Sequence, residues 1–279
     1  MCRLLRISSY RQRIVETNSF PVTMFSFTLL AILFACANAA NLPEVKIVGG
    51  TPADINDAPW QVAILRLGTN NDYNHVCGGV IIKSSSILTA AQCTSGTQAS
   101  FFRIRSGSSY HQNGGQVTAV IRKKEHESYD HNTYQNDLAF LYLYNDINFG
   151  VSAAPAILPP LGLVVPDGMY CFITGWGTTS VGGSKPLELH KITVPSVNQE
   201  RCVSAYSNIL AVTPNMLCAG NLGTGGMDAC VGDTGGPLTI TNVLIGITSW
   251  GLSCGTPDYP GVYTRVPMYR NWIDLNLGN

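Results

Sequence analysis

Short runs of β-branched and aromatic residues, separated by clusters of turn-forming residues, recur through most of this chain. The runs cover residues 61–67, 79–82, 86–90, 101–106, 116–122, 138–144, 171–175, 189–194, 237–240 and 244–250. This regular spacing predicts an antiparallel barrel or sandwich. Only residues 269–277 offer a convincing helix, with Trp272 and Ile273 available for its buried face. Because helices do not alternate with the strands, a parallel βαβ fold is disfavoured.

The size and charge of the chain narrow the class further. Its 279 residues, 45% of them hydrophobic, suit one large all-β domain or two small ones. Residues 1–46 hold five of the 17 basic and two of the 17 acidic residues, which leaves 12 basic and 15 acidic side chains in the rest. A nucleic-acid or membrane surface would need a basic patch or stripe, so neither kind of partner is expected.

The N-terminal segment has the features of a targeting sequence. An apolar run over 25–37 follows a basic stretch and ends in the small-residue pattern Ala37-Asn38-Ala39. The run is shorter than the roughly 20 residues of a membrane span, and its position argues against the alternative of a buried core helix. We therefore expect a signal peptide over 1–39, starting at Met1 or Met24, and a secreted, extracellular protein.

Export implies an oxidising compartment, in which cysteines pair. Two of the nine cysteines lie within the leader and seven follow it. An odd number leaves one thiol without a partner in the same chain.

Four motifs occur in order along the chain: Ile47-Val48-Gly49-Gly50 behind Lys46, Leu88-Thr89-Ala90-Ala91-Gln92-Cys93, Asn136-Asp137-Leu138-Ala139-Phe140 and Gly232-Asp233-Thr234-Gly235-Gly236-Pro237-Leu238. Together they resemble the chymotrypsin-fold, trypsin-like serine proteases over about residues 47–279. The resemblance implies an all-β fold of two orthogonally packed antiparallel β-barrels, with a cleft between them and a C-terminal helix.

The same resemblance marks a catalytic triad that is altered at two positions. Gln92 stands where the family has its general-base histidine and Thr234 where it has its nucleophilic serine, while Asp137 matches the family's aspartate. A primary amide does not take up a proton near neutral pH, and Thr234 adds a methyl group and a stiff χ1. We expect the amide of Gln92 to donate to Asp137 and its carbonyl to accept from Thr234, so that the hydrogen-bond network survives without its proton relay.

The remaining histidines offer little replacement. By the resemblance, His75 is a packing residue and His131 is the histidine nearest the cleft, although a solvated loop side chain is the simpler interpretation. His126 lies in the same loop as His131, and His111 and His190 lie elsewhere.

The parts that recognise a substrate match the family better. Backbone amides of Gly232 and Thr234 are expected to form the oxyanion hole. Asp228 stands where trypsin-like enzymes place the carboxylate of the specificity pocket, and Gly251 and Gly261 match glycines that keep that pocket open. An aspartate there pairs with lysine or arginine; the alternative is a solvated turn residue.

The resemblance also implies processing and cross-links. Cleavage behind Lys46 by a trypsin-like protease would release a propeptide, 40–46, and create an ammonium group at Ile47 that pairs with Asp233. Expected disulfides join Cys77 to Cys93, Cys202 to Cys218 and Cys230 to Cys254. Cys171 is left unpaired because its usual partner position holds Ile240; it is either a buried small hydrophobe or the site of a disulfide-linked dimer.

These expectations give three hypotheses. The first is a non-catalytic serine protease homologue that binds an extracellular protein or peptide with exposed Lys or Arg and regulates a proteolytic system. The second is a weak or unusual endopeptidase with Lys/Arg preference. The third is a structural partner linked through Cys171. No cofactor and no metal site is expected, since residues 106–116 lack the clustered carboxylates of a calcium loop.

Overall fold

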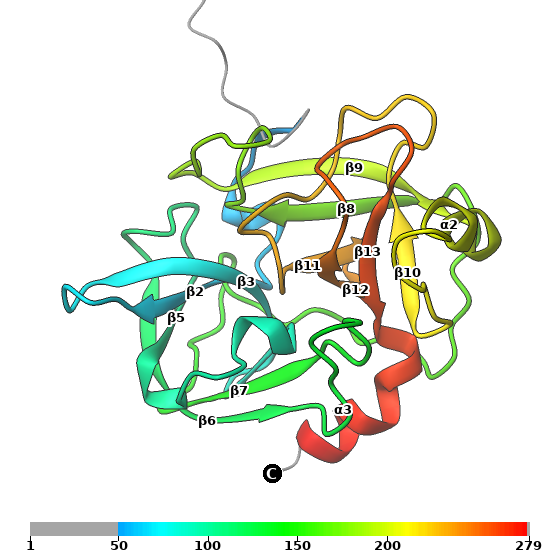
Figure 1. Cartoon of the computed structure of the whole chain (residues 1–279). Helices are drawn as coiled ribbons and strands as arrows, with labels where there is room; N and C mark the ends of the chain where they lie inside the picture. Colours follow the sequence, from blue (N-terminus) through cyan, green and yellow to red (C-terminus); the bar gives the residue numbers. More distant parts are fainter. Residues whose placement is uncertain (1–49, 278–279) are drawn as a thin grey trace, which may run out of the picture. The chain divides into compact units, whose positions relative to one another are not determined.

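The computed structural model describes residues 50–277. The predicted signal peptide over 1–39, the propeptide over 40–46 and the activation residues Lys46 and Ile47 lie outside the described residues. Two closed, six-stranded antiparallel β-barrels follow each other along the described chain (Figure 1), which is the chymotrypsin-like fold that the resemblance implied.

The first barrel closes in the order β2-β3-β4-β7-β6-β5. Its strands are β2 (Gln61–Leu67), β3 (Tyr73–Lys83), β4 (Ser86–Thr89), β5 (Phe102–Ser106), β6 (Gln116–Glu125) and β7 (Ala139–Leu143). Burial alternates along β5: Phe102, Ile104 and Ser106 are buried, while the residues between them are partly exposed. One face of the strand therefore points into the barrel. Phe102 and Ile104 join one core cluster with residues of the other five strands.

The second barrel is formed by β9-β10-β13-β12-β11-β8, with the two-residue strand β1 (Thr51–Pro52) added to the edge of β9. Its strands are β8 (Tyr170–Gly175), β9 (His190–Val197), β10 (Met216–Ala219), β11 (Pro237–Ile240), β12 (Val243–Trp250) and β13 (Gly261–Arg265). Ile173, Val194, Leu217, Leu238 and Ile245 fill its interior.

The C-terminal helix α3 (Arg270–Leu277) begins one residue later than predicted, because a 3₁₀ turn over Val266–Tyr269 precedes it. Ile273 is fully buried and belongs to the core cluster of the first barrel. Tyr142 donates its hydroxyl to the carbonyl of Asn276 at 3.0 Å, so the helix is held against that barrel (Figure 1).

Two strands of the second barrel and one α-helix are among the elements that the sequence analysis did not predict. Strands β10 and β13 contain only four and five residues, and neither has a polar–apolar alternation to mark it. The helix α2 (Gln199–Ala205) is also short, but it carries a start signal that was missed: the side chain of Asn198 accepts hydrogen bonds from the amides of Glu200 and Arg201.

Disulfides join the three expected pairs, Cys77–Cys93, Cys202–Cys218 and Cys230–Cys254. Cys171 is free and has an exposed fraction of 0%. It lies on β8 inside the core of the second barrel, where burial raises the pKa of its thiol to about 12. An intermolecular disulfide through this thiol would require the barrel to open.

Candidate active-site cleft

Residues from both barrels meet around Asp137. Gln92 lies in a single 3₁₀ turn, Ala91–Cys93, directly after β4, and Asp137 precedes β7. The backbone amide of Gln92 donates to one carboxylate oxygen of Asp137 at 2.9 Å, and the side-chain Nε2 donates to the other at 2.5 Å. The same carboxylate accepts the hydroxyl of Ser249, on β12, at 2.6 Å.

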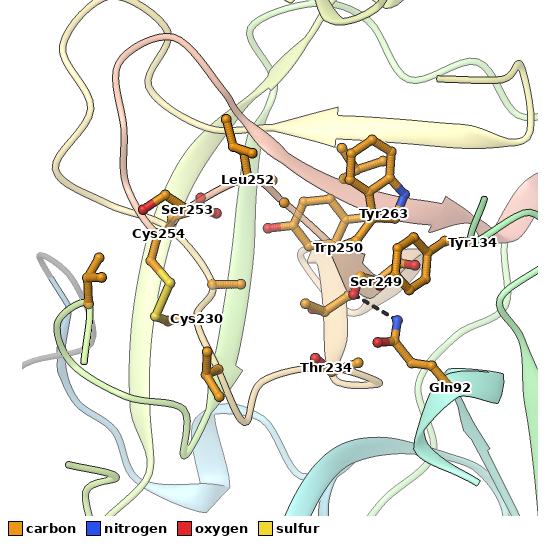
Figure 2. Close-up of a pocket in the computed structure, with 18 of the residues that line it drawn as sticks. Gln92, Tyr134, Cys230, Thr234, Ser249, Trp250, Leu252, Ser253, Cys254 and Tyr263 are labelled. Atoms are coloured by element: carbon orange, nitrogen blue, oxygen red, sulfur yellow. Dashed lines mark hydrogen bonds between the residues drawn. A yellow bond between two sulfur atoms is a disulfide. The ribbon is translucent and has the colours of Figure 1, made fainter. Parts of the chain in front are cut away.

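The Gln92 side chain also reaches the second barrel. Its Nε2 donates to the carbonyl of Ser249 at 2.9 Å, the contact drawn as a dashed line in Figure 2. The expected donation to Asp137 is therefore present, but the expected acceptance from Thr234 is wrong. Both amide hydrogens go to Asp137 and Ser249, and within residues 50–277 the Thr234 hydroxyl has no hydrogen-bond partner.

Asp137 is fully buried, and desolvation raises the pKa of its carboxyl, although the hydrogen bonds from Ser249 and Gln92 oppose that shift. All three of these donors are neutral. The site therefore holds its carboxylate by hydrogen bonding alone.

Thr234 sits in a tight loop between Cys230 and β11. The next residue, Gly235, has φ 82°, and a Cβ placed there would lie 2.2 Å from Thr89 Oγ1. Glycine is required at this position because the loop passes against the end of β4. Across the same contact the Gly78 amide donates to the carbonyl of Thr234 at 2.8 Å, which fixes the loop to the first barrel.

The amides expected to form an oxyanion hole are available. In the described part of the chain, neither the Gly232 N–H nor the Thr234 N–H donates to another residue. Gly232 has φ 109°, a conformation that side chains rarely adopt. The loop can thus offer two unpaired N–H groups to a ligand oxygen.

Asp233 points away from the cleft into the interior. Its carboxylate accepts the amide of Gly177 at 2.7 Å and the amide of Cys230 at 2.9 Å. Burial raises the pKa of its carboxyl to about 6, although the nearby positive charge of Lys185 acts in the opposite direction. The carboxylate thus occupies the buried position that pairing with the Ile47 ammonium would require, and that pairing stays a prediction.

A pocket of about 390 Å³ opens beside Gln92 and Thr234 (Figure 2). Asp228 lies within it with an exposed fraction of only 3%. One carboxylate oxygen accepts the Gly255 amide at 3.2 Å, and the other has no hydrogen-bond partner among the described residues. Burial raises the pKa of this carboxyl to about 7. A buried carboxylate oxygen without a partner can be satisfied by a cation that enters the pocket, and the cation-binding role of Asp228 stays a prediction.

The two expected glycines line this pocket. A Cβ at Gly261 would lie 2.7 Å from Asp228 Oδ1 and 3.0 Å from the hydroxyl of Tyr263, so a side chain there would collide with the carboxylate. A Cβ at Gly251 would meet nothing closer than 3.9 Å. The space in front of Gly251 is open, and a larger side chain would fill the slot.

No histidine lines the pocket, although all five in the chain fall within residues 50–277. His75 and His111 are buried with their ring centroids 5.0 Å apart, and His190 is buried on β9. His126 packs against Trp272 at 5.1 Å, and His131 is exposed.

Sequence reasoning missed Ser249 as a partner of Asp137, and it missed the aromatic wall of the pocket. The ring of Tyr134 stacks on Trp250 with centroids 6.1 Å apart. Tyr134 has φ 52°, which is uncommon for a bulky residue and marks a constrained loop. These contacts join residues more than 100 positions apart, so no local signal pointed to them.

Residues 50–277 contain neither a group of side chains suited to a metal ion nor a helix suited to cross a membrane. No three His, Cys, Asp or Glu side chains in that range are grouped so that they could hold a metal ion. Nor does any helix there have the length and apolarity to span a membrane.

Known proteins are similar to this chain over most of its length. The family model described as trypsin matches residues 47–273. A vitellin-degrading protease of Bombyx mori is 39% identical over 94% of this chain and 96% of its own length. A trypsin of Phaedon cochleariae is 39% identical over 90% and 98%, and Trypsin Blo t 3 of Blomia tropicalis is 44% identical over 90% and 96%.

Proposed function

Because this chain belongs to the trypsin family of serine proteases, we propose that it is a secreted member that binds rather than cuts. Its cleft takes the lysine or arginine side chain of an extracellular protein or peptide. The observation that carries this proposal is the amide of Gln92, which is hydrogen-bonded to Asp137 and Ser249 at the place of a proton acceptor. Hydrolysis by this family's route needs a group there that takes a proton and returns it.

The surroundings of Thr234 support the same conclusion. Its hydroxyl has no acceptor among the described residues, and no histidine lines the pocket. A threonine nucleophile works elsewhere with a chain-terminal amine as its base, but Thr234 is internal. Loss of one triad member leaves only about 10³–10⁴-fold acceleration over water, from binding and the oxyanion hole. Two altered members leave no more.

The binding half of the proposal rests on Asp228. It offers an unpartnered oxygen to a pocket that Gly251 and Gly261 leave open. A guanidinium or ammonium group entering the pocket would pair with the carboxylate and satisfy it.

Regulation by processing completes the proposal. Cleavage behind Lys46 by a trypsin-like protease would free an ammonium group for Asp233, which adjoins Thr234 in the loop that carries both free amides. The cleaved chain would then act as a binding protein or decoy in an extracellular proteolytic system. Three disulfides and relatives named as trypsins are consistent with such a secreted protein.

A second candidate is a weak endopeptidase with Lys/Arg preference. One specific observation favours it: the amides of Gly232 and Thr234 remain free to stabilise an oxyanion. A cleft with that feature alone retains some transition-state stabilisation.

Active-site chemistry on the secreted protein separates the two candidates. After controlled cleavage behind Lys46, the protein is mixed with an arginyl peptide substrate and a fluorophosphonate probe, with Thr234→Ala as control. A fluorescent benzamidine, which carries an arginine-like amidinium, reports the pocket independently, with Asp228→Asn as control.

The expected result is amidinium binding that depends on Asp228, without turnover or labelling. Turnover or labelling that disappears in Thr234→Ala would show that Thr234 is activated and would establish the endopeptidase. Absence of amidinium binding would overturn the proposed binding function.

A further inference from the structure

The mouth of the pocket is lined by large apolar side chains that remain exposed. Val181, Val231 and Leu252 have exposed fractions of 69%, 69% and 52%, and all three line the pocket. They come from three separate segments: the β8–β9 connection, the loop before β11 and the turn after β12. Figure 2 shows Leu252 at one end of the pocket and Gln92 at the other.

An aromatic wall continues this surface. Trp250 lines the pocket between the stacked ring of Tyr134 and the ring of Tyr206, whose centroid lies 4.8 Å from its own in an edge-on arrangement. We call Val181, Val231, Trp250 and Leu252 the apolar collar. Its members come from different segments of the chain and line the same pocket.

The charge at this opening is simple. Asp228 is the only charged side chain among the described residues that line the pocket. Its unpartnered oxygen is buried in a pocket whose other described lining residues are neutral. A ligand that complements both features has one cation with apolar groups on either side of it, and exposed apolar patches of this kind mark interaction sites.

We propose that the collar selects its partner: a protein loop or peptide in which a single arginine or lysine is flanked on both sides by apolar residues. This inference rests on the proposed function for the basic side chain, and adds the chemistry of its neighbours. Val181, Val231 and Leu252 would lose their water on contact with those flanks, and Trp250 would cover one face of the bound chain. Partners with charged or polar flanks would not remove the apolar side chains of the collar from water, so they would bind more weakly.

Two synthetic peptides test the proposal on the secreted protein cleaved behind Lys46. Each has one central arginine, with two leucines or valines on each side in one peptide and two serines or glycines in the other. Affinity is measured by fluorescence anisotropy, and mass spectrometry checks that the peptides stay intact. The variant Val231→Ser/Leu252→Ser removes half of the collar, and Val151→Ser is the matched control, because Val151 is 84% exposed and does not line the pocket.

We expect the apolar-flanked peptide to bind at least roughly tenfold more tightly than the polar one, since each covered side chain contributes about a tenfold change. The double variant should lower that preference, because only Val181 and Trp250 of the collar remain, and Val151→Ser should change neither the preference nor the affinity for the fluorescent benzamidine. Equal affinity for the two peptides, with benzamidine binding intact, would overturn the collar and leave the proposed function standing. Failure of benzamidine and both peptides alike would overturn both.

Discussion

Protonation of Asp228 should control the affinity of the pocket for cations. The pKa of this carboxyl is raised to about 7 in the empty protein because it is buried and one of its oxygens has no partner. An amidinium pairs only with the ionised form, so binding competes with a proton. Between pH 8 and pH 5 the affinity should fall by roughly a hundredfold, whereas a carboxyl at its ordinary pKa of 3.8 would lose less than about 10%.

The assay is a fluorescence titration with the fluorescent benzamidine, whose amidinium stays charged over the whole range. Asp228→Asn should abolish most of the affinity and flatten the profile. A flat profile in the unaltered protein would refute the reasoning, because it would mean that Asp228 is already ionised in the empty pocket. A slope that persists in Asp228→Asn would show that a second group titrates, and Asp233, whose pKa is raised to about 6, would be tested next by Asp233→Asn.

The same variant, Asp228→Asn, should weaken amidinium binding but increase the free energy of unfolding at high pH. A carboxyl whose pKa is raised on folding binds its proton more tightly in the native state, so the free energy of unfolding decreases as pH rises from about 3.8 to about 7. At pH 8 the ionised Asp228 lowers the free energy of unfolding by up to about 4 kcal/mol, because its pKa is shifted by about three pH units. Asp228→Asn should therefore unfold at higher guanidinium concentration at pH 8 and differ little at pH 4.

Three further predictions concern the rest of the cleft and the core. Gln92→His with Thr234→Ser should restore cleavage after arginine or lysine, measured with the arginyl peptide, while Gln92→His alone restores little; no cleavage by the processed double variant would show that the cleft differs in more than its triad. Gln92→Met should lower the free energy of unfolding by about 2–3 kcal/mol, because it leaves buried Asp137 short of a donor, whereas Gln98→Met, at an exposed glutamine, should change it little; equal effects would contradict the network. The thiol of Cys171 should react with a disulfide reagent only after unfolding, and the protein should run as a monomer on a non-reducing gel; rapid native labelling or a dimer band would refute its burial.

Most of the fold was predictable because its strands carry local patterns. The run over 61–67 coincides with β2, and the run over 237–240 with β11. The short strand β13 was missed since it begins with Gly261, a residue whose reason lies in the pocket and not in the strand. Local pattern cannot reveal a residue selected by a distant carboxylate.

The candidate site could also be predicted only in part. The resemblance identified Asp137 and Gln92, and elementary chemistry predicted the hydrogen bond between them, which the structure contains. It could not predict that the second amide hydrogen goes to Ser249, because that acceptor lies 157 positions away and competes with Thr234 only in three dimensions. The sequence could not predict the exposed collar either, because the exposure of a valine depends on which residues the folded chain packs over it.

The hydrogen bond from Gln92 to the Ser249 carbonyl bears on how long a ligand stays bound in the cleft. It ties the first barrel to the second across the cleft, and an amide keeps its charge state over the range from pH 5 to 8 in which an imidazole changes. Under the proposed function the cleft cuts no bond, so it releases its ligand only by dissociation. At an association rate of about 10⁶ M⁻¹s⁻¹, a micromolar ligand would stay for about one second and a nanomolar ligand for about a quarter of an hour. How long a partner is withheld from other proteins would then be set by affinity alone.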